Sequence, residues 1–188
     1  MEIGNISIPA EGREWQAVKT WQLVPWLIAY AWLMWTYREM GARILDAAYM
    51  VAHEAGHPLF SYLGVEIITV LGGTVMQLLV PILLALSFAW RGHTLGTAFC
   101  GWATFNSLTG VAIYMMDARA KGLALVAPGM ASDDEGIGHD WEYIFNWIGH
   151  GMIQHDQQLG HLTMAVAWIG MFASVGWLIW MWRRYPAE

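Results

Sequence analysis

Residues 44–62 of the chain read ILDAAYMVAHEAGHPLFSY. This run is apolar and of helical length, yet it carries Asp46, His53, Glu54 and His57. Ionisable side chains are costly inside an apolar membrane helix, and they are retained where they serve a function. The run therefore predicts a membrane helix and, within it, the position of a functional site.

The composition of the whole chain favours the same environment. Of the 188 residues, 57% are hydrophobic and 13% are charged, whereas a soluble domain is roughly 45–50% apolar and about 25% charged. Mean hydropathy is +0.39. A soluble enzyme, a disordered chain and a secreted disulfide scaffold are poor interpretations of such a composition, and membrane lipid is the expected surrounding.

The charges and the single cysteine exclude further classes. The net charge is −6, with 15 acidic residues against nine lysines and arginines, which offers no basic patch for nucleic acid. Cys100, being alone, forms neither an internal disulfide nor a thiolate metal cluster. No secretory signal peptide is recognisable in the first twenty residues.

The apolar runs predict an all-α fold, a polytopic membrane helix bundle that forms one integral membrane domain over residues 1–188. A polar N-terminal segment (1–19) precedes it, and a polar loop (117–140) is expected to contribute to the site. A polar linker containing His150, His155 and His161 leads to the last run. About five runs can span a bilayer, and these are residues 21–37, 44–62, 67–90, 94–116 and 162–182. One short run, residues 141–149, is expected to form an interfacial or re-entrant helix.

Arginines next to the predicted spans suggest an orientation. With five spans, the first and third turns and the C-terminus share one side, and these carry Arg38, Arg43, Arg91, Arg183 and Arg184. Positive charge close to helix ends marks the cytoplasmic side. We therefore expect an integral membrane protein with a cytoplasmic C-terminus.

His53, Glu54 and His57 form an H-E-x-x-H pattern. Positions i and i+4 lie one turn apart on one helix face, so both imidazoles can bind one metal ion. A Zn²⁺ ion in such a site lowers the pKa of a water molecule, and a neighbouring glutamate can act as general base. The pattern predicts one Zn²⁺ site with Glu54 as the catalytic base; a hydrogen-bonded structural cluster is the alternative.

A tetrahedral zinc site requires a third protein ligand. Asp117, His139 and Asp140 are the candidates, since the end of the fourth predicted span lies on the same side as His57. The linker histidines at 150, 155 and 161 are weaker candidates because solvated histidine is common in polar segments. His93 lies on the opposite side. Asp46 is seven residues from His53, about 10.5 Å along a helix, which is too far for the same ion.

The motif, followed by Gly64-Val65-Glu66-Ile67-Ile68 and then Gly72-Gly73, resembles the site-2 protease family of intramembrane metalloproteases. The resemblance covers roughly residues 40–90. It implies a zinc ion, hydrolysis of a peptide bond, and a distant aspartate ligand, which the family usually carries in an Asp-Gly motif. The chain has no Asp-Gly pair; its nearest equivalents are Asp117-Ala118-Arg119 and His139-Asp140-Trp141. The order of motifs also looks like that of a group of small bacterial membrane proteins, which implies a shared metal site.

Two function classes follow. The first is a zinc-dependent membrane metallohydrolase that resembles site-2 proteases and acts on a membrane-embedded or membrane-proximal peptide. The second is a non-catalytic metal-binding subunit of a larger membrane complex, including one that contains pigment or haem. A di-iron site is a third option, because Glu54 and His57 have E-x-x-H spacing, but the chain has no second such pair.

Overall fold

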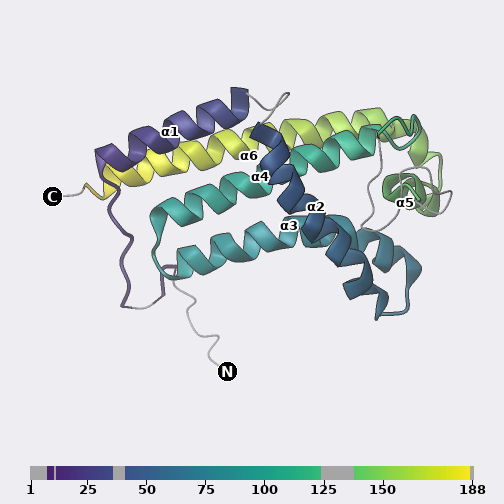
Figure 1. The fold of residues 1–188 in the computed structure, drawn as a ribbon, viewed down its shortest axis with the longest axis horizontal. Coiled ribbons are helices and arrows are strands. Elements are labelled where there is room, and N and C mark those ends of the chain that lie inside the picture. Colours follow the sequence, from purple (N-terminus) through teal and green to yellow (C-terminus); the bar gives the residue numbers. More distant parts are fainter. Residues whose placement is uncertain (1–7, 11, 36–40, 124–137, 187–188) are drawn as a thin grey trace. The chain divides into compact units, whose positions relative to one another are not determined.

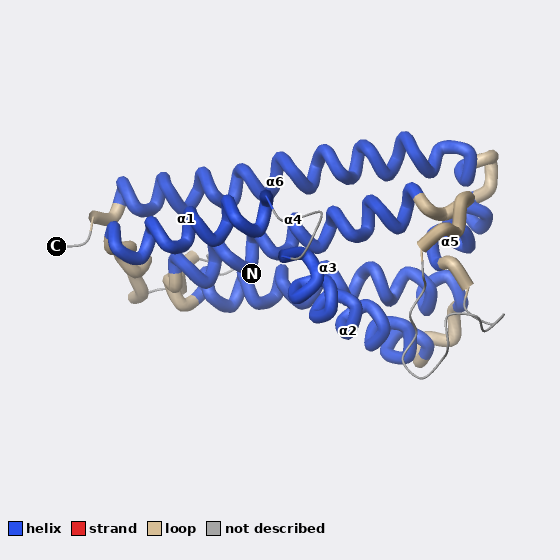
Figure 2. The backbone as a smooth tube through the Cα atoms, turned by 45° about the horizontal axis from the view of Figure 1, so that its top comes forward, coloured by secondary structure: helices blue, strands red, loops and turns tan. Residues whose placement is uncertain are grey.

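The computed structural model describes residues 8–10, 12–35, 41–123 and 138–186. These residues are helical apart from the N-terminal segment before Thr20, short connecting turns and one isolated parallel bridge between Val18 and Pro186. Figure 2 shows the helices in blue and the loops in tan. The all-α prediction is confirmed for the described part of the chain. Figure 1 labels the helices, which are α1 (Thr20–Trp35), α2 (Gly41–Ser61), α3 (Glu66–Trp90), α4 (Thr94–Met116), α5 (Asp140–Ile148), the 3-10 turn η2 (Met152–His155) and α6 (Asp156–Arg184).

Two of the described helical stretches are long and apolar enough to cross a membrane. Glu66–Trp90 has 25 residues and contains an 18-residue window with a mean hydropathy of 2.2, and Met152–Arg184 has 33 residues and contains such a window with a mean hydropathy of 1.8. At 1.5 Å per residue both exceed the roughly 30 Å hydrocarbon core of a bilayer. The prediction of five spans stays a prediction for the other helices.

Helix α6 begins earlier than the sequence predicted. Residues 150–161 were expected to form a polar linker, but η2 and the first turns of α6 occupy most of it. Asp156 starts the helix, and its Oδ1 accepts a 2.7 Å hydrogen bond from the Gln157 amide. A carboxylate at a helix N-terminus stabilises it by capping free amides and through the helix dipole, and this local effect allows helix in a polar stretch.

The chain divides into two compact units. The first comprises Met1–Arg43, Pro81–Thr104 and Ile169–Glu188, and the second comprises Ile44–Val80 and Phe105–Trp168. Helices α3, α4 and α6 each contribute one part to each unit. Of the predicted polar loop 117–140, residues 124–137 lie outside the described part of the chain.

The interior of the first unit is aromatic. Tyr30 of α1 is 2% exposed and packs on Trp102 of α4, with ring centroids 5.4 Å apart. Trp26 contacts Phe99 at 5.4 Å. Aromatic pairs at this separation stabilise beyond the area they bury. This packing holds α1 against the first half of α4.

In the second unit, α2 and α3 approach each other at glycines. A Cβ on Gly56 would lie 2.1 Å from the carbonyl oxygen of Gly72, and one on Gly72 would lie 2.8 Å from the carbonyl oxygen of Gly56. No real side chain tolerates such contacts, so the two backbones touch. Glycine permits this close approach because it carries no side chain. Gly56 and Gly72 thereby set the spacing between α2 and α3.

An ion pair joins the end of α4 to the start of α6 within the same unit. Asp156 is 1% exposed, and its two carboxylate oxygens accept hydrogen bonds from Nε and Nη2 of Arg119 at 2.9 and 2.6 Å. The bidentate geometry satisfies the buried carboxylate. Loss of the arginine leaves that charge without its partner.

We predict that Arg119→Met lowers the melting temperature of the detergent-solubilised protein by roughly 5 °C. Circular dichroism measures the change. Arg91→Met, at an exposed arginine of the first unit, is the matched control and should leave the melting temperature unchanged. Equal melting temperatures for the two variants would contradict the role of the ion pair.

Candidate metal centre

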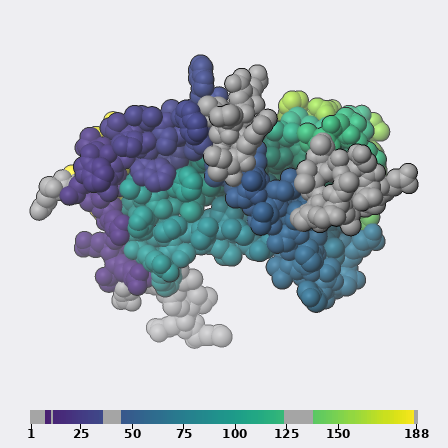
Figure 3. All heavy atoms as spheres, in the orientation of Figure 1, coloured from purple at the N-terminus to yellow at the C-terminus, as the bar shows by residue number. Residues whose placement is uncertain are grey.

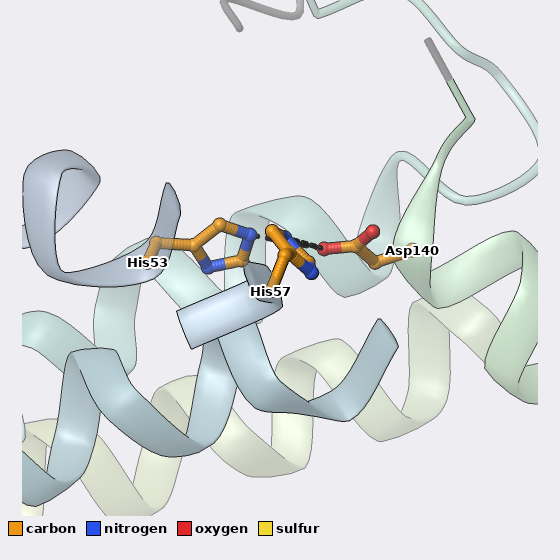
Figure 4. A group of neighbouring side chains, drawn as sticks. All are labelled: His53, His57 and Asp140. Carbon is orange, nitrogen blue, oxygen red and sulfur yellow. Dashed lines mark hydrogen bonds and ion pairs between the residues drawn. The ribbon is translucent and has the colours of Figure 1, made fainter. Parts of the chain in front are cut away.

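His53 and His57 of α2 and Asp140, the first residue of α5, turn their side chains toward one another (Figure 4). Asp140 Oδ2 lies 2.9 Å from Nε2 of His53 and 3.4 Å from Nε2 of His57. The three ligand atoms all lie within 4.8 Å of one another. Ligands of a tetrahedral zinc ion at 2.0–2.1 Å are separated by about 3.3 Å. The group can therefore hold a metal ion.

The other ring nitrogens of the two histidines are fixed by oxygen atoms of α3. His53 Nδ1 lies 3.1 Å from Oε1 of Gln77, and His57 Nδ1 lies 3.0 Å from the backbone oxygen of Thr69. Both partners only accept, so each Nδ1 carries a proton. Nε2 of each ring is then the atom that faces Asp140 and that can bind a metal ion once it is deprotonated. Metal-binding histidines show this arrangement, which fixes the tautomer and the ring orientation. Gln77 Nε2 in turn donates to the Ser107 carbonyl at 3.3 Å.

Gly73 leaves the space beside the two Nε2 atoms open. A Cβ at this position would lie 2.6 Å from Nε2 of both His53 and His57. Any residue other than glycine would thus fill the place where the two lone pairs converge. The site therefore requires glycine at position 73, while the packing of α3 on α2 requires glycine at position 72.

Asp140 is oriented from two directions. Its backbone N–H donates to the hydroxyl of Tyr114 on α4 at 3.1 Å, and its carboxylate contacts the two histidines. Desolvation raises the pKa of this carboxyl, but hydrogen bonds and charge interactions with His53 and His57 outweigh it, so the pKa is lowered. The carboxyl is therefore ionised at neutral pH, as a metal ligand must be.

A cavity of about 580 Å³ opens beside the three residues, and such a volume is typical of small-molecule sites. Its lining is drawn from α2, α3, α4 and the start of α5, and it includes Glu54, which is half-buried. The space-filling view in Figure 3 shows α2, in blue, at the surface of the molecule. Glu54 therefore lines the same cavity as His53, His57 and Asp140.

Asp117 and His139, two further predicted ligands, lie outside the three-residue group and contact each other. Asp117 Oδ1 and Oδ2 accept hydrogen bonds from the amides of Gly122 and Leu123 at 2.8 and 3.1 Å. His139 caps α5, with Nδ1 accepting from the Glu142 amide at 3.3 Å, and its Nε2 lies 3.5 Å from Asp117. Burial lowers the pKa of His139. Both residues shape the turns that lead to and from the site.

The remaining ionisable candidates lie apart from the group. His150, His155 and His161 are exposed. His93 accepts a hydrogen bond from the Gly96 amide at 2.9 Å and so caps α4. Asp46 lines the cavity further along α2.

The sequence interpretation missed Thr69 and Tyr114 as supporting residues. Thr69 acts through its backbone carbonyl, which leaves no trace in residue type. Tyr114 stands at the end of an apolar run, where tyrosine is common in membrane helices. Comparisons with protein-family models, with curated proteins and with solved structures find no match to this chain.

We predict that Gly73→Ala abolishes stoichiometric metal binding, because its methyl group would contact both Nε2 atoms. Elemental analysis of the purified protein after dialysis measures the bound metal. Gly101→Ala is the matched control, because a Cβ there meets nothing closer than 3.5 Å. Full metal occupancy in Gly73→Ala would contradict the proposed position of the ion.

We also predict that Asp140→Asn lowers Zn²⁺ affinity at least 100-fold, since a neutral amide replaces an anionic ligand. Asp117→Asn keeps the affinity within a few-fold, because Asp117 serves the turn at Gly122 and Leu123. Competition with a chromogenic chelator gives both affinities. The reverse order of the two variants would assign the third ligand to Asp117.

Proposed function

We propose that this protein is a zinc-dependent membrane metallohydrolase, similar to the site-2 proteases, that cleaves a membrane-embedded or membrane-proximal peptide. One observation carries the proposal: two histidines and an aspartate converge at the edge of a cavity that Glu54 also lines. Three protein ligands leave a fourth tetrahedral position for water or substrate, as in catalytic zinc sites.

The donor set suits the ion. Two imidazoles and one carboxylate are borderline ligands that zinc accepts, and the oxygen partners of both Nδ1 atoms supply the outer contacts that such sites use. When bound, zinc supplies a Lewis acid that makes a water molecule acidic enough to lose its proton near neutral pH.

The chain's own residues would then handle the protons. Glu54 accepts a proton from water as the water oxygen bonds to the peptide carbonyl carbon. The same carboxyl then gives the proton to the leaving amide nitrogen as the C–N bond breaks. A peptide and one water become an acid and an amine, and Glu54 ends in its starting state.

The membrane assignment extends beyond the two long apolar stretches. We propose that α1, α2 and α4 are also embedded, that the protein belongs to the bacterial inner membrane, and that its C-terminus is cytoplasmic. Exposed tryptophans on α1 support embedding, since Trp21, Trp32 and Trp35 are 69%, 51% and 88% exposed. In water, so large an apolar surface would be unfavourable.

A second candidate is a non-catalytic metal-binding subunit of a larger membrane complex. The same exposed tryptophans favour it, because aromatic side chains are enriched where proteins pack against partners. The two candidates differ in what Glu54 does, since a structural ion needs no general base.

Glu54→Gln separates them. We predict that the variant retains one zinc ion per chain but cleaves about 10²–10⁴-fold more slowly, because the general base is lost. The assay incubates zinc-loaded protein with a panel of single-span membrane peptides in detergent micelles and detects products by mass spectrometry. Glu66→Gln, at an exposed carboxylate that begins α3, is the control and keeps the rate.

Equal cleavage by the wild type and Glu54→Gln, or a zinc-loaded wild type that cleaves no peptide in the panel, would favour the subunit. A purified protein that binds no zinc would overturn both candidates.

A further inference from the structure

Tyr114 places a hydroxyl beside the metal-binding group. It lies on α4 and lines the cavity, and its oxygen accepts the backbone N–H of Asp140 at 3.1 Å. Its ring meets the ring of His53 edge-on, with centroids 6.1 Å apart, and packs on His139 at 4.2 Å. These contacts on two sides hold the phenol in one orientation.

The hydroxyl proton of Tyr114 has no hydrogen-bond acceptor among the described residues. A phenol is protonated near neutral pH and can donate while it accepts. Tyr49, the other tyrosine that lines the cavity, differs in this respect, because its hydroxyl donates to Oδ1 of Asn106 at 3.2 Å. Tyr114 therefore has a donor to offer a ligand, and the Tyr49 donor is already engaged.

Thr74 gives a second, independent sign that the cavity accommodates a polar ligand. It follows Gly73 on α3, lines the same cavity and is 8% exposed. Its Oγ1 has no hydrogen-bond partner in the described part of the chain. A buried hydroxyl without a partner is unfavourable, so a ligand atom that hydrogen-bonds there would relieve the cost.

We propose that Tyr114 is a catalytic residue whose hydroxyl donates a hydrogen bond to the carbonyl oxygen of the peptide that is cleaved. The inference rests on the proposed hydrolytic function and adds the group that stabilises negative charge. When water bonds to the carbonyl carbon, the C=O π electrons move to the oxygen. The Tyr114 proton meets this charge without being transferred, and the charge returns to the carbonyl when the C–N bond breaks.

The position suits this role because the donor is fixed before the reaction. A donor that is already oriented stabilises developing charge without reorganisation, and removing one such donor typically costs about 10²–10³-fold in rate. The Asp140 amide donates to the Tyr114 hydroxyl oxygen and fixes its position, and the hydroxyl proton remains available to a ligand in the cavity that Tyr114 lines. A phenylalanine would keep the ring packing but would lack both the donor and the acceptor for the Asp140 amide, so Tyr114→Phe has to be compared in metal affinity as well as in ligand affinity.

The test uses the full-length protein, loaded with Co²⁺ in an uncharged detergent, and acetohydroxamate as the probe. Acetohydroxamate presents a carbonyl oxygen and an anionic oxygen to a metal, and changes in the visible Co²⁺ spectrum report its binding. We predict that Tyr114→Phe binds acetohydroxamate about 10-fold more weakly, with Co²⁺ affinity unchanged. Tyr49→Phe is the matched control and keeps both affinities.

Each outcome has one meaning. If the wild type binds Co²⁺ but not acetohydroxamate, no open position exists, and the hydrolytic function itself fails. If the wild type binds the probe and Tyr114→Phe binds it equally well, the donor role of Tyr114 is wrong while the hydrolytic function stands. If Tyr114→Phe loses Co²⁺ affinity as well, Tyr114 only positions Asp140, and the proposal is again overturned.

Discussion

The contact between the backbones of α2 and α3 is the constraint on which the site depends. Gly56 and Gly72 bring the helices together until the carbonyl oxygen of each lies where a side chain of the other would begin. At this spacing His57 Nδ1 reaches the Thr69 carbonyl and His53 Nδ1 reaches Gln77. A wider spacing would leave both rings free to rotate, and their Nε2 lone pairs would no longer converge.

Two carboxylates of the second unit, those of Asp140 and Asp156, are little exposed, and each lies next to side chains that stabilise its charge. The carboxylate of Asp140 is 13% exposed and is stabilised by two histidines, while that of Asp156 is 1% exposed and is held by Arg119. A buried carboxylate is tolerated only with such partners. The two differ in their use: the arginine pair is complete in itself, whereas two imidazoles and a carboxylate can together hold a metal cation once the imidazoles are deprotonated. The first is structural, and the second is the candidate metal centre.

Much of the fold and part of the site could be predicted from sequence. Period and apolarity predicted most helices, and the i, i+4 spacing predicted that His53 and His57 share one helix face. Asp140 was one of several candidates for the third, because spacing along the chain does not report which of Asp117, His139 and Asp140 turns inward. Competing local hydrogen bonds explain why Asp140, and not the other two, joins the histidines in the structure: amides in the turn at residues 122 and 123 occupy Asp117, and the α5 cap occupies His139. Such local competition depends on backbone geometry that residue type does not encode.

The chain separation of the ligands has a consequence for folding. His53 and Asp140 are 87 residues apart, and an ion bound to both would close that long loop as a crosslink does. Closing a loop of this length removes conformational entropy from the unfolded chain worth about 4–5 kcal/mol in the chain-entropy model of disulfides. The metal would then act as a reversible crosslink, and its binding free energy would add to the free energy of folding, as it does for structural zinc. An ion bound at this site would thereby favour the folded state over the unfolded one.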